Sequence, residues 1–334
     1  MTKNIKIGLI GLVAIILFVY WIILFATKTQ MTTANYLWQA ILAALSIMAG
    51  ILGVFTAKKW SWLKSGVGKG VFFVSLGLLM WGLGQAGWAY YTLAYPDQEV
   101  VYNKLVDVLY FSSIPLWTYG IWCLTKATGA KYGLRSVTGK IVVIITSVIV
   151  AAVSYYFLII VARGGSSYFD GQTIWNAFFD LAYAFGDAIN LILAVVIFGL
   201  SWKFLGGRFK RPIIAILSAF GLIYLADFFF SYYDGNSQYY NGHWSDLLYL
   251  AMVAVMGVGI CMLDPSKEAS ILKKMFVRTS SNVQPNTEPT IQPVPVNTQE
   301  EPKEVSSTDE NLINQGQTGG VATSPINNQQ GGEQ

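Results

Sequence analysis

The sequence predicts an all-α integral membrane protein with eight transmembrane helices and a disordered cytoplasmic tail. Of the 334 residues, 54% are hydrophobic and only 12% are charged, whereas soluble proteins carry about 25% charged residues. Eight apolar segments approach the ~20 residues that a helix needs to cross the hydrocarbon core of a bilayer. Basic residues gather in every second connection between these segments, as expected for a multi-pass membrane protein.

Each apolar segment is bounded by polar or charged residues, which set the limits of the expected helices. The first segment is expected to be a retained helix, because its apolar stretch from Ile7 to Ala26 is longer than the core of a signal peptide, about 7–15 residues. The eight predicted spans are Ile5–Ala26, Ala34–Ala57, Gly70–Leu93, Leu105–Leu124, Ile141–Val161, Asn176–Trp202, Pro212–Tyr233 and Ser245–Leu263.

The basic residues predict the orientation of the chain. Of the 22 lysines and arginines, 19 fall on the side that holds the N-terminus, and only Lys28, Lys104 and Arg163 fall on the other side. Cytoplasmic connections are the ones enriched in lysine and arginine. We therefore expect a cell-membrane protein with both termini in the cytoplasm. Because the basic residues stand between long apolar runs, their expected partner is the lipid bilayer and not a nucleic acid.

The two halves of the transmembrane domain (residues 1–263) resemble each other at a nearly constant offset. Residues 1–124 and 141–263 match at offsets between 139 and 142 positions. Four helices in each half would place the halves parallel to each other, related by a pseudo-two-fold axis along the membrane normal. Chance similarity among tyrosine-rich apolar segments is the alternative. The matched pairs are Asn35 and Asn176, Gln39 and Asp180, Ser46 and Asp187, Gln85 and Asp227, Asp107 and Asp246, and Tyr110 and Tyr249.

The chain changes character after the last predicted span. Residues 264–278 are basic and amphipathic, so we expect them to lie on the inner membrane surface. Residues 279–334 consist mainly of Asn, Gln, Pro, Thr, Glu and Gly. Such a composition does not bury enough apolar surface to fold, and it predicts a disordered tail without an enzyme domain.

Polar residues within or next to the predicted spans are the candidate ligand-binding or proton-sensing residues. A charged side chain in a span usually faces the interior of the bundle or water. On the sixth span, four polar residues at spacings of 3, 4 and 3 share one helix face. The candidates are Asp180, Tyr183, Asp187, Asn190, Asp227, Gln85, Trp88, Asp107 and Asp246.

Two interpretations of these polar residues are open. They could line a polar, aromatic-rimmed cavity that faces outward and holds a small ligand or protons. Alternatively, they could form hydrogen bonds between helices and hold the bundle together. Asp107 and Asp246 begin predicted helices, where a carboxylate also suits the free amides of the first turn.

Cysteine, histidine and lysine usage narrows the chemistry. The two cysteines, Cys123 and Cys261, are expected to be small buried residues without a disulfide. The one histidine, His243, is expected to be solvated in an outer loop, and a single histidine cannot form a multi-histidine metal site or ligate a haem from both sides. We expect no metal and no cofactor. The lysines are expected to lie outside the spans, which disfavours a retinal Schiff base.

Short motifs rich in glycine, aspartate and aromatic residues recur in residues 70–263. The motifs are Gly87-Trp88-x-Tyr90, Asp107-Val-Leu-Tyr110 with Pro115 and Gly120, Phe185-Gly186-Asp187, Ala226-Asp227-x3-Ser231-Tyr232, and Tyr240-x-Gly242-x3-Asp246-Leu-Leu-Tyr249. Together they resemble a bacterial membrane sensory region, the multi-helix module that precedes diguanylate cyclase, phosphodiesterase or histidine kinase domains. The resemblance implies a signal-receiving membrane module, and the tail departs from the family because it carries no such catalytic domain.

The sequence thus predicts a non-enzymatic sensory or receptor module that binds a small ligand from the extracytoplasmic side. Its signal would pass to a separate cytoplasmic protein. A small-solute or proton-coupled transporter is the alternative, favoured by the repeat and the aspartates within spans. An intramembrane aspartyl protease is a third hypothesis, because Ala184-Phe185-Gly186-Asp187 is similar to a Gly-x-Gly-Asp motif, with Asp227 as its partner. The first glycine of that motif is alanine here.

Overall fold

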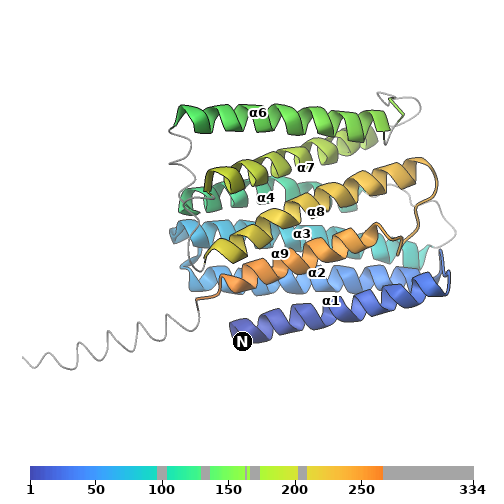
Figure 1. The fold of residues 1–334 in the computed structure, drawn as a ribbon. Coiled ribbons are helices and arrows are strands. Elements are labelled where there is room, and N and C mark those ends of the chain that lie inside the picture. Colours follow the sequence, from blue (N-terminus) through green and yellow to red (C-terminus); the bar gives the residue numbers. More distant parts are fainter. Residues whose placement is uncertain (96–103, 129–135, 162–163, 166–173, 202–208, 266–334) are drawn as a thin grey trace, which may run out of the picture. The chain divides into compact units, whose positions relative to one another are not determined.

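The computed structural model describes residues 1–95, 104–128, 136–161, 164–165, 174–201 and 209–265, all within the compact unit Met1–Ser281 (Figure 1). In these ranges the chain forms eight α helices and no β strand. A 3₁₀ turn at Trp62–Lys64 precedes α3, and a π-helical stretch at Tyr155–Val161 continues α6. The helices are α1 (Lys3–Ala26), α2 (Thr33–Lys59), α3 (Gly66–Ala94), α4 (Lys104–Thr128), α6 (Val137–Ser154), α7 (Ile174–Ser201), α8 (Lys210–Gly235) and α9 (Asp246–Met262).

Each predicted span coincides with one of these helices, and the observed helices differ from the predicted spans mainly at their ends. Two helices begin one residue after a serine cap: Ser65 Oγ accepts from Gly68 N at 2.9 Å, and Ser136 Oγ accepts from Gly139 N at 2.9 Å. Such caps satisfy amides that the first turn leaves free. Apart from Asp264 and Pro265, the predicted amphipathic segment 264–278 and the predicted disordered tail 279–334 lie outside the described residues.

Five of the helices are long and apolar enough to cross a membrane: α1, α2, α3, α8, and α6 together with its π-helical continuation. The outward faces of α1 and α6 are apolar; Ile15 and Ile144, for example, are 62% and 63% exposed. Contiguous apolar faces of this size are unfavourable in water and normal against lipid tails. The chain is therefore a helical protein of the multi-pass membrane type.

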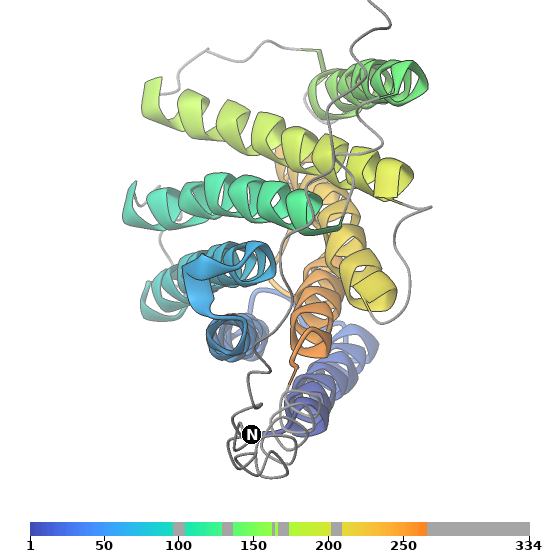
Figure 2. The ribbon, with the colours of Figure 1, turned by 90° about the vertical axis from the view of Figure 1, so that its left-hand side faces the viewer.

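Six helices form a closed ring, and the other two pack on its outside. Around the ring, α2 packs on α3, α3 on α4, α4 on α7, α7 on α8, α8 on α9, and α9 back on α2. Helix α1 packs against α2 and α9, and α6 packs against α7. Figure 2 shows the helices from one end, with α6 and α1 at opposite edges. Each half of the chain thus contributes three consecutive helices to the ring and one helix to its outside.

Two glycines bring helix pairs into close contact, one in each half of the chain. A Cβ atom at Gly120 of α4 would lie 2.7 Å from Val74 Cγ2 and 2.8 Å from Val74 N of α3. A Cβ atom at Gly259 of α9 would lie 3.0 Å from Ile216 Cγ1 of α8. Without a side chain at these positions the helix backbones can approach each other closely, as is common between membrane helices.

We expect Gly120→Ala to destabilise the protein by about 1–3 kcal/mol, because the new methyl group overlaps the α3 backbone at Val74. The matched control is Gly221→Ala in α8, where a Cβ atom meets nothing within 4 Å. Alanine is favoured over glycine in a helix by about 1 kcal/mol, so this variant should be as stable as the parent or slightly more stable. Thermal unfolding in detergent checks both; equal effects at the two glycines would contradict the close packing of α3 and α4.

Candidate functional site

Two aspartates meet between α7 and α8. Asp187 of α7, which is 4% exposed, and Asp227 of α8 lie close enough for their carboxyl groups to interact. The hydroxyl of Tyr249 in α9 also donates to Asp227 Oδ1. Two carboxyl groups can share a hydrogen bond only when one of them carries a proton. The structure therefore brings together the two aspartates that the sequence analysis proposed as a pair, in an arrangement where the two carboxyl groups can share a proton.

Further acidic and tyrosine side chains surround this pair. Tyr110 of α4 lies close enough to Asp227, Asp107 and Asp246 to interact with their charges. The hydroxyl of Tyr239, in the loop before α9, donates to Asp246 Oδ1 at 3.1 Å. Neither Asp187 nor Asp227 forms an ion pair with a lysine or arginine within the described part of the chain. We call this group the acid–tyrosine cluster; its members are Asp107, Tyr110, Asp187, Asp227, Tyr239, Asp246 and Tyr249.

Helices α2 and α3 add neutral amide groups next to this cluster. The ring of Trp81 contacts the rings of Tyr110 and Tyr249, with centroid distances of 6.2 and 5.6 Å. One turn farther along α3, the side chain of Gln85 accepts a hydrogen bond from Gln39 Nε2 of α2. All six ring helices therefore supply a polar side chain to one region of the bundle.

Two other candidate residues of α7, Tyr183 and Asn190, contact α4. Tyr183 donates to the carbonyl oxygen of Asp107 at 3.0 Å and to its carboxylate at 3.2 Å. Asn190, one turn beyond Asp187, accepts from the hydroxyl of Thr118 at 2.8 Å. The polar face of α7 is thus divided between two neighbouring helices. The side chain of the candidate Asp180 lies outside the described residues.

The loop between α8 and α9, residues 236–245, closes one end of the bundle. Trp88 Nε1 of α3 donates to Asn241 Oδ1 at 3.1 Å, so this candidate residue holds the loop. Asp246 was expected to cap α9, but its carboxylate accepts from Gly242 N at 2.8 Å and from Tyr239. The first amides of α9 donate instead to carbonyls of the preceding turn, such as Asp246 N to His243 O. Asp246 therefore fixes the loop to α9.

His243 is buried in this loop, and the expectation of a solvated histidine is wrong. It is 7% exposed, and its Nδ1 lies 2.9 Å from Ser245 Oγ. The rings of Tyr233 and Tyr240 stand 4.4 and 5.3 Å from the imidazole. Burial lowers the pKa of His243 below its ordinary value of 6.5, because the charged form loses its hydration. Aromatic residues of α8 and of the loop come together around this histidine only when the chain folds. The burial of His243 could therefore not be predicted from its position in the sequence.

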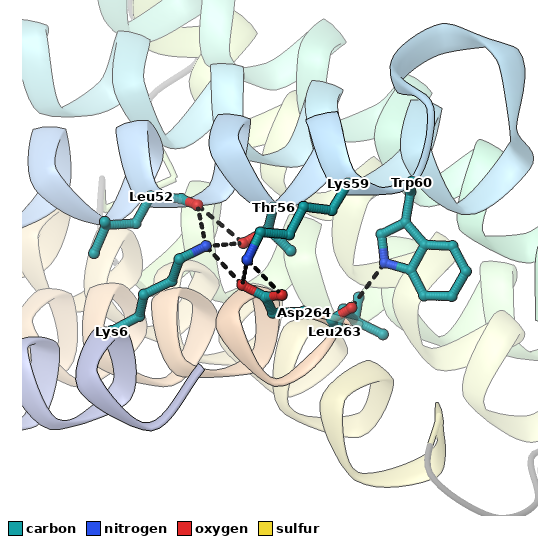
Figure 3. A network of polar contacts seen from close by, with 7 residues as sticks. All are labelled: Lys6, Leu52, Thr56, Lys59, Trp60, Leu263 and Asp264. Carbon is teal, nitrogen blue, oxygen red and sulfur yellow. Dashed lines mark hydrogen bonds and ion pairs between the residues drawn. The ribbon is translucent and has the colours of Figure 1, made fainter. Parts of the chain in front are cut away.

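At the opposite end of the bundle lies an ion-pair network that the sequence analysis missed (Figure 3). The lysines were expected to lie outside the spans, but Lys6 falls within the predicted span Ile5–Ala26; it is in the first turn of α1 and only 2% exposed. Its Nζ lies 2.9 Å from Asp264 Oδ2 and 2.8 Å from Thr56 Oγ1, and Nζ of Lys59 lies 2.8 Å from the same Asp264 oxygen. We call these four residues, Lys6, Thr56, Lys59 and Asp264, the Asp264 clamp.

The charges of the clamp lower the pKa of Asp264. Burial by itself raises the pKa of this carboxyl group, but the ammonium groups of Lys59 and Lys6 outweigh burial and hold the pKa below its ordinary value. Next to the clamp, Trp60 Nε1 donates to the carbonyl of Leu263 at 2.7 Å. The residues that follow α9 are therefore tied to both α1 and α2.

Comparison with models of known protein families, with curated proteins and with solved structures yields no match. In the described ranges, no group of three or more histidine, cysteine, aspartate or glutamate side chains is arranged to hold a metal ion. Both cysteines are free and buried, which confirms the expectation for Cys123 and Cys261. The chemistry of the protein therefore has to be inferred from the acid–tyrosine cluster.

We expect the stability of the protein to fall on acidification in a way that depends on His243. Because the folded loop lowers the pKa of this residue, the unfolded chain binds the proton more tightly. The contribution of neutral His243 is complete above about pH 6.5 and is lost as the pH falls from that value through the lowered pKa. Thermal unfolding of the parent and of His243→Gln between pH 8 and pH 5 measures the difference. If both lose stability equally over this range, the burial of His243 has no role in it.

Proposed function

We propose that the protein is a membrane-embedded sensory module whose receiving site is the acid–tyrosine cluster. The pair Asp187–Asp227 carries the proposal, because two buried carboxyl groups from α7 and α8 lie close enough to share a proton, and Tyr249 of α9 donates to one of them. Loss of that proton, or entry of a cation or another small ligand, would put two like charges side by side or separate the carboxyl groups. Either change favours a different packing of α7 against α8. A sensor needs such a difference in affinity between two states.

We further propose that all eight helices span the membrane and that both termini are cytoplasmic. Contacts at the two ends of the bundle support alternating helix directions. Lys6 near the start of α1, Lys59 at the end of α2 and Asp264 after α9 meet at one end. At the other end, Trp21 Nε1 near the end of α1 donates to Gly242 O in the loop before α9, at 3.0 Å. The abundance of lysine and arginine assigns the first end to the cytoplasm.

An internal duplication is also part of the proposal. The helix neighbours of one half correspond to those of the other: α2–α3, α3–α4 and α4–α7 have α7–α8, α8–α9 and α9–α2 as counterparts. The glycine contacts agree as well, because Gly120 and Gly259 are 139 positions apart and their partners Val74 and Ile216 are 142 apart. These are the offsets found in the sequence. The acid–tyrosine cluster would then lie near the pseudo-two-fold axis, with amide groups on one side and carboxyl groups on the other.

The output of the sensor would be read by a separate cytoplasmic protein. The composition of residues 279–334 does not favour a packed effector domain. The proposed ligand would come from the extracytoplasmic side, where the loop of residues 236–245 covers the cluster through Asp246 and Tyr239. The lipid bilayer is the constant partner of the outward apolar faces of α1 and α6.

A proton-coupled transporter is the second candidate, favoured by the corresponding neighbours in the two halves. Proton flux into liposomes that contain the purified protein separates the two functions. A flux that is abolished by Asp187→Asn would favour transport. The intramembrane protease is favoured only by the contact between Asp187 and Asp227. Cleavage of a labelled membrane peptide that both Asp187→Asn and Asp227→Asn abolish would support that activity.

We expect Asp187→Asn and Asp227→Asn to remove a proton-binding group without preventing membrane insertion. In nanodiscs, infrared difference spectra between alkaline and acidic pH should contain a carboxylic-acid carbonyl band from the pair, and each variant should lose it. Asp234→Asn is the matched control, because this aspartate lies on the same helix but is exposed near its end.

The spectra of folded Asp187→Asn and Asp227→Asn protein decide between the interpretations. Loss of the band in both variants, with the Asp234→Asn spectrum unchanged, is the expected result. A band that persists in both variants would mean that the pair holds no exchangeable proton. The sensory proposal would then lose the observation that carries it.

A further inference from the structure

Helix α9 connects the acid–tyrosine cluster to the Asp264 clamp. Its first turn carries Asp246 and Tyr249, which bind the loop of residues 236–245 and Asp227. Its last turn leads directly into Leu263 and Asp264. A helix of 17 residues spans ~25 Å at 1.5 Å per residue. A displacement of Tyr249 at one end of this single rigid element would therefore be felt at the other end.

The clamp depends on one negative charge held between two positive ones. Asp264 has a fully buried side chain, and Lys6 is buried as well. Loss of one partner from a buried ion pair leaves an uncompensated charge and is strongly unfavourable, whereas loss of both partners is often tolerated. Lys59 differs from Lys6, because its side chain is 35% exposed and water can solvate it. The contact between Lys6 and Asp264 is therefore the one whose closure is sensitive to small displacements of α9.

We infer that the Asp264 clamp is a latch through which α9 reports the state of the acid–tyrosine cluster to the cytoplasm. When closed, the latch holds the end of α9 and the start of the following segment against α1 and α2. When the contact between Asp187 and Asp227 changes, Tyr249 shifts α9, Asp264 leaves Lys6, and the end of α9 with Leu263 and Asp264 becomes available to a cytoplasmic partner. The coupling between cluster and latch rests on the sensory function proposed above.

The chain contains a native reporter for this latch. Cys261 of α9 is fully buried one turn before Asp264, within electrostatic reach of Lys6 and Asp264. Cys123 of α4 is also free and buried, and it serves as an internal control. Thiols react with maleimides only when they are exposed and ionised. Alkylation of the two cysteines by N-ethylmaleimide can be followed separately by mass spectrometry in the full-length protein.

The first test breaks the latch directly, in nanodiscs. Asp264→Asn should speed the alkylation of Cys261 by about tenfold or more and leave Cys123 at its parental rate, because the buried Lys6 loses its counter-charge. Lys6→Met with Asp264→Asn removes both charges and should restore slow alkylation. Lys59→Met is the matched lysine control and should change the rate by less than about threefold, since the Lys59 side chain is 35% exposed and water weakens its ion pair.

Two outcomes of the first test would overturn the latch. An unchanged rate at Cys261 in Asp264→Asn would mean that the ion pairs do not hold α9. Equal acceleration of both cysteines would mean that the whole bundle loosens. In either case the sensory function of the acid–tyrosine cluster would stand unaffected, because its infrared signature is measured independently.

The second test asks whether the cluster controls the latch. Asp227→Asn should change the alkylation rate of Cys261 by about threefold or more, in either direction, while Asp234→Asn leaves it unchanged. If Asp227→Asn removes the infrared band but leaves Cys261 at its parental rate, the receiving site stands and transmission through α9 is overturned. If Asp227→Asn changes Cys261 without any infrared band in the parent, transmission stands and the proton-binding function fails.

Discussion

A carboxyl group inside a helical membrane bundle can be retained only if neighbouring helices supply hydrogen-bond partners for it. This constraint governs the arrangement of the ring. Asp187 contacts Asp227, and the hydroxyl of Tyr249 donates a hydrogen bond to Asp227. The hydroxyl of Tyr239, in the loop, donates a hydrogen bond to Asp246. Each partner comes from a different element, so the acid–tyrosine cluster can form only when α7, α8, α9 and the loop are in place together. Cooperative assembly of the second half of the chain follows from its polar groups as much as from its apolar ones.

The two halves of the ring each contain a polar contact between neighbouring helices, and the two contacts differ in chemistry. In the first half, Gln39 and Gln85 form a neutral amide contact. In the second half, Asp187 and Asp227 form an acidic contact that depends on a proton. Trp81, one turn before Gln85 on α3, contacts the rings of Tyr110 and Tyr249, one from each half. Under the proposed duplication, the ring would combine an inert contact with one that can change its charge, and this difference between the halves would give the ring a direction of response.

The helices could be predicted because the apolar length of each segment depends only on neighbouring positions in the chain. Asp187 and Asp227 could also be proposed as partners, because the similarity of Ala184-Phe185-Gly186-Asp187 to the motif of an intramembrane aspartyl protease calls for a second aspartate within a span. The sequence could not predict the contact of Asp264 with Lys6, whose partners are more than 250 positions apart, nor the aromatic neighbours that bury His243. Both depend on how the ends of helices meet across the bundle, and periodicity along the chain does not determine that.

The glycine contacts are unevenly distributed between the halves. Gly70, Gly77 and Gly120 lock α3 against α4, whereas Gly199 of α7 and Gly221 of α8 face open space. Close backbone contact makes α3 and α4 a rigid pair, because any sliding of one helix along the other meets steric resistance. Gly199 and Gly221 provide no such interlocking, although Gly186 packs α7 against Ile114 of α4 and Gly259 of α9 packs against α8. Each of the two helices that carry the aspartates is thus held on its outer neighbour, and a change at Asp187 and Asp227 would be accommodated most easily in the seam between α7 and α8 themselves.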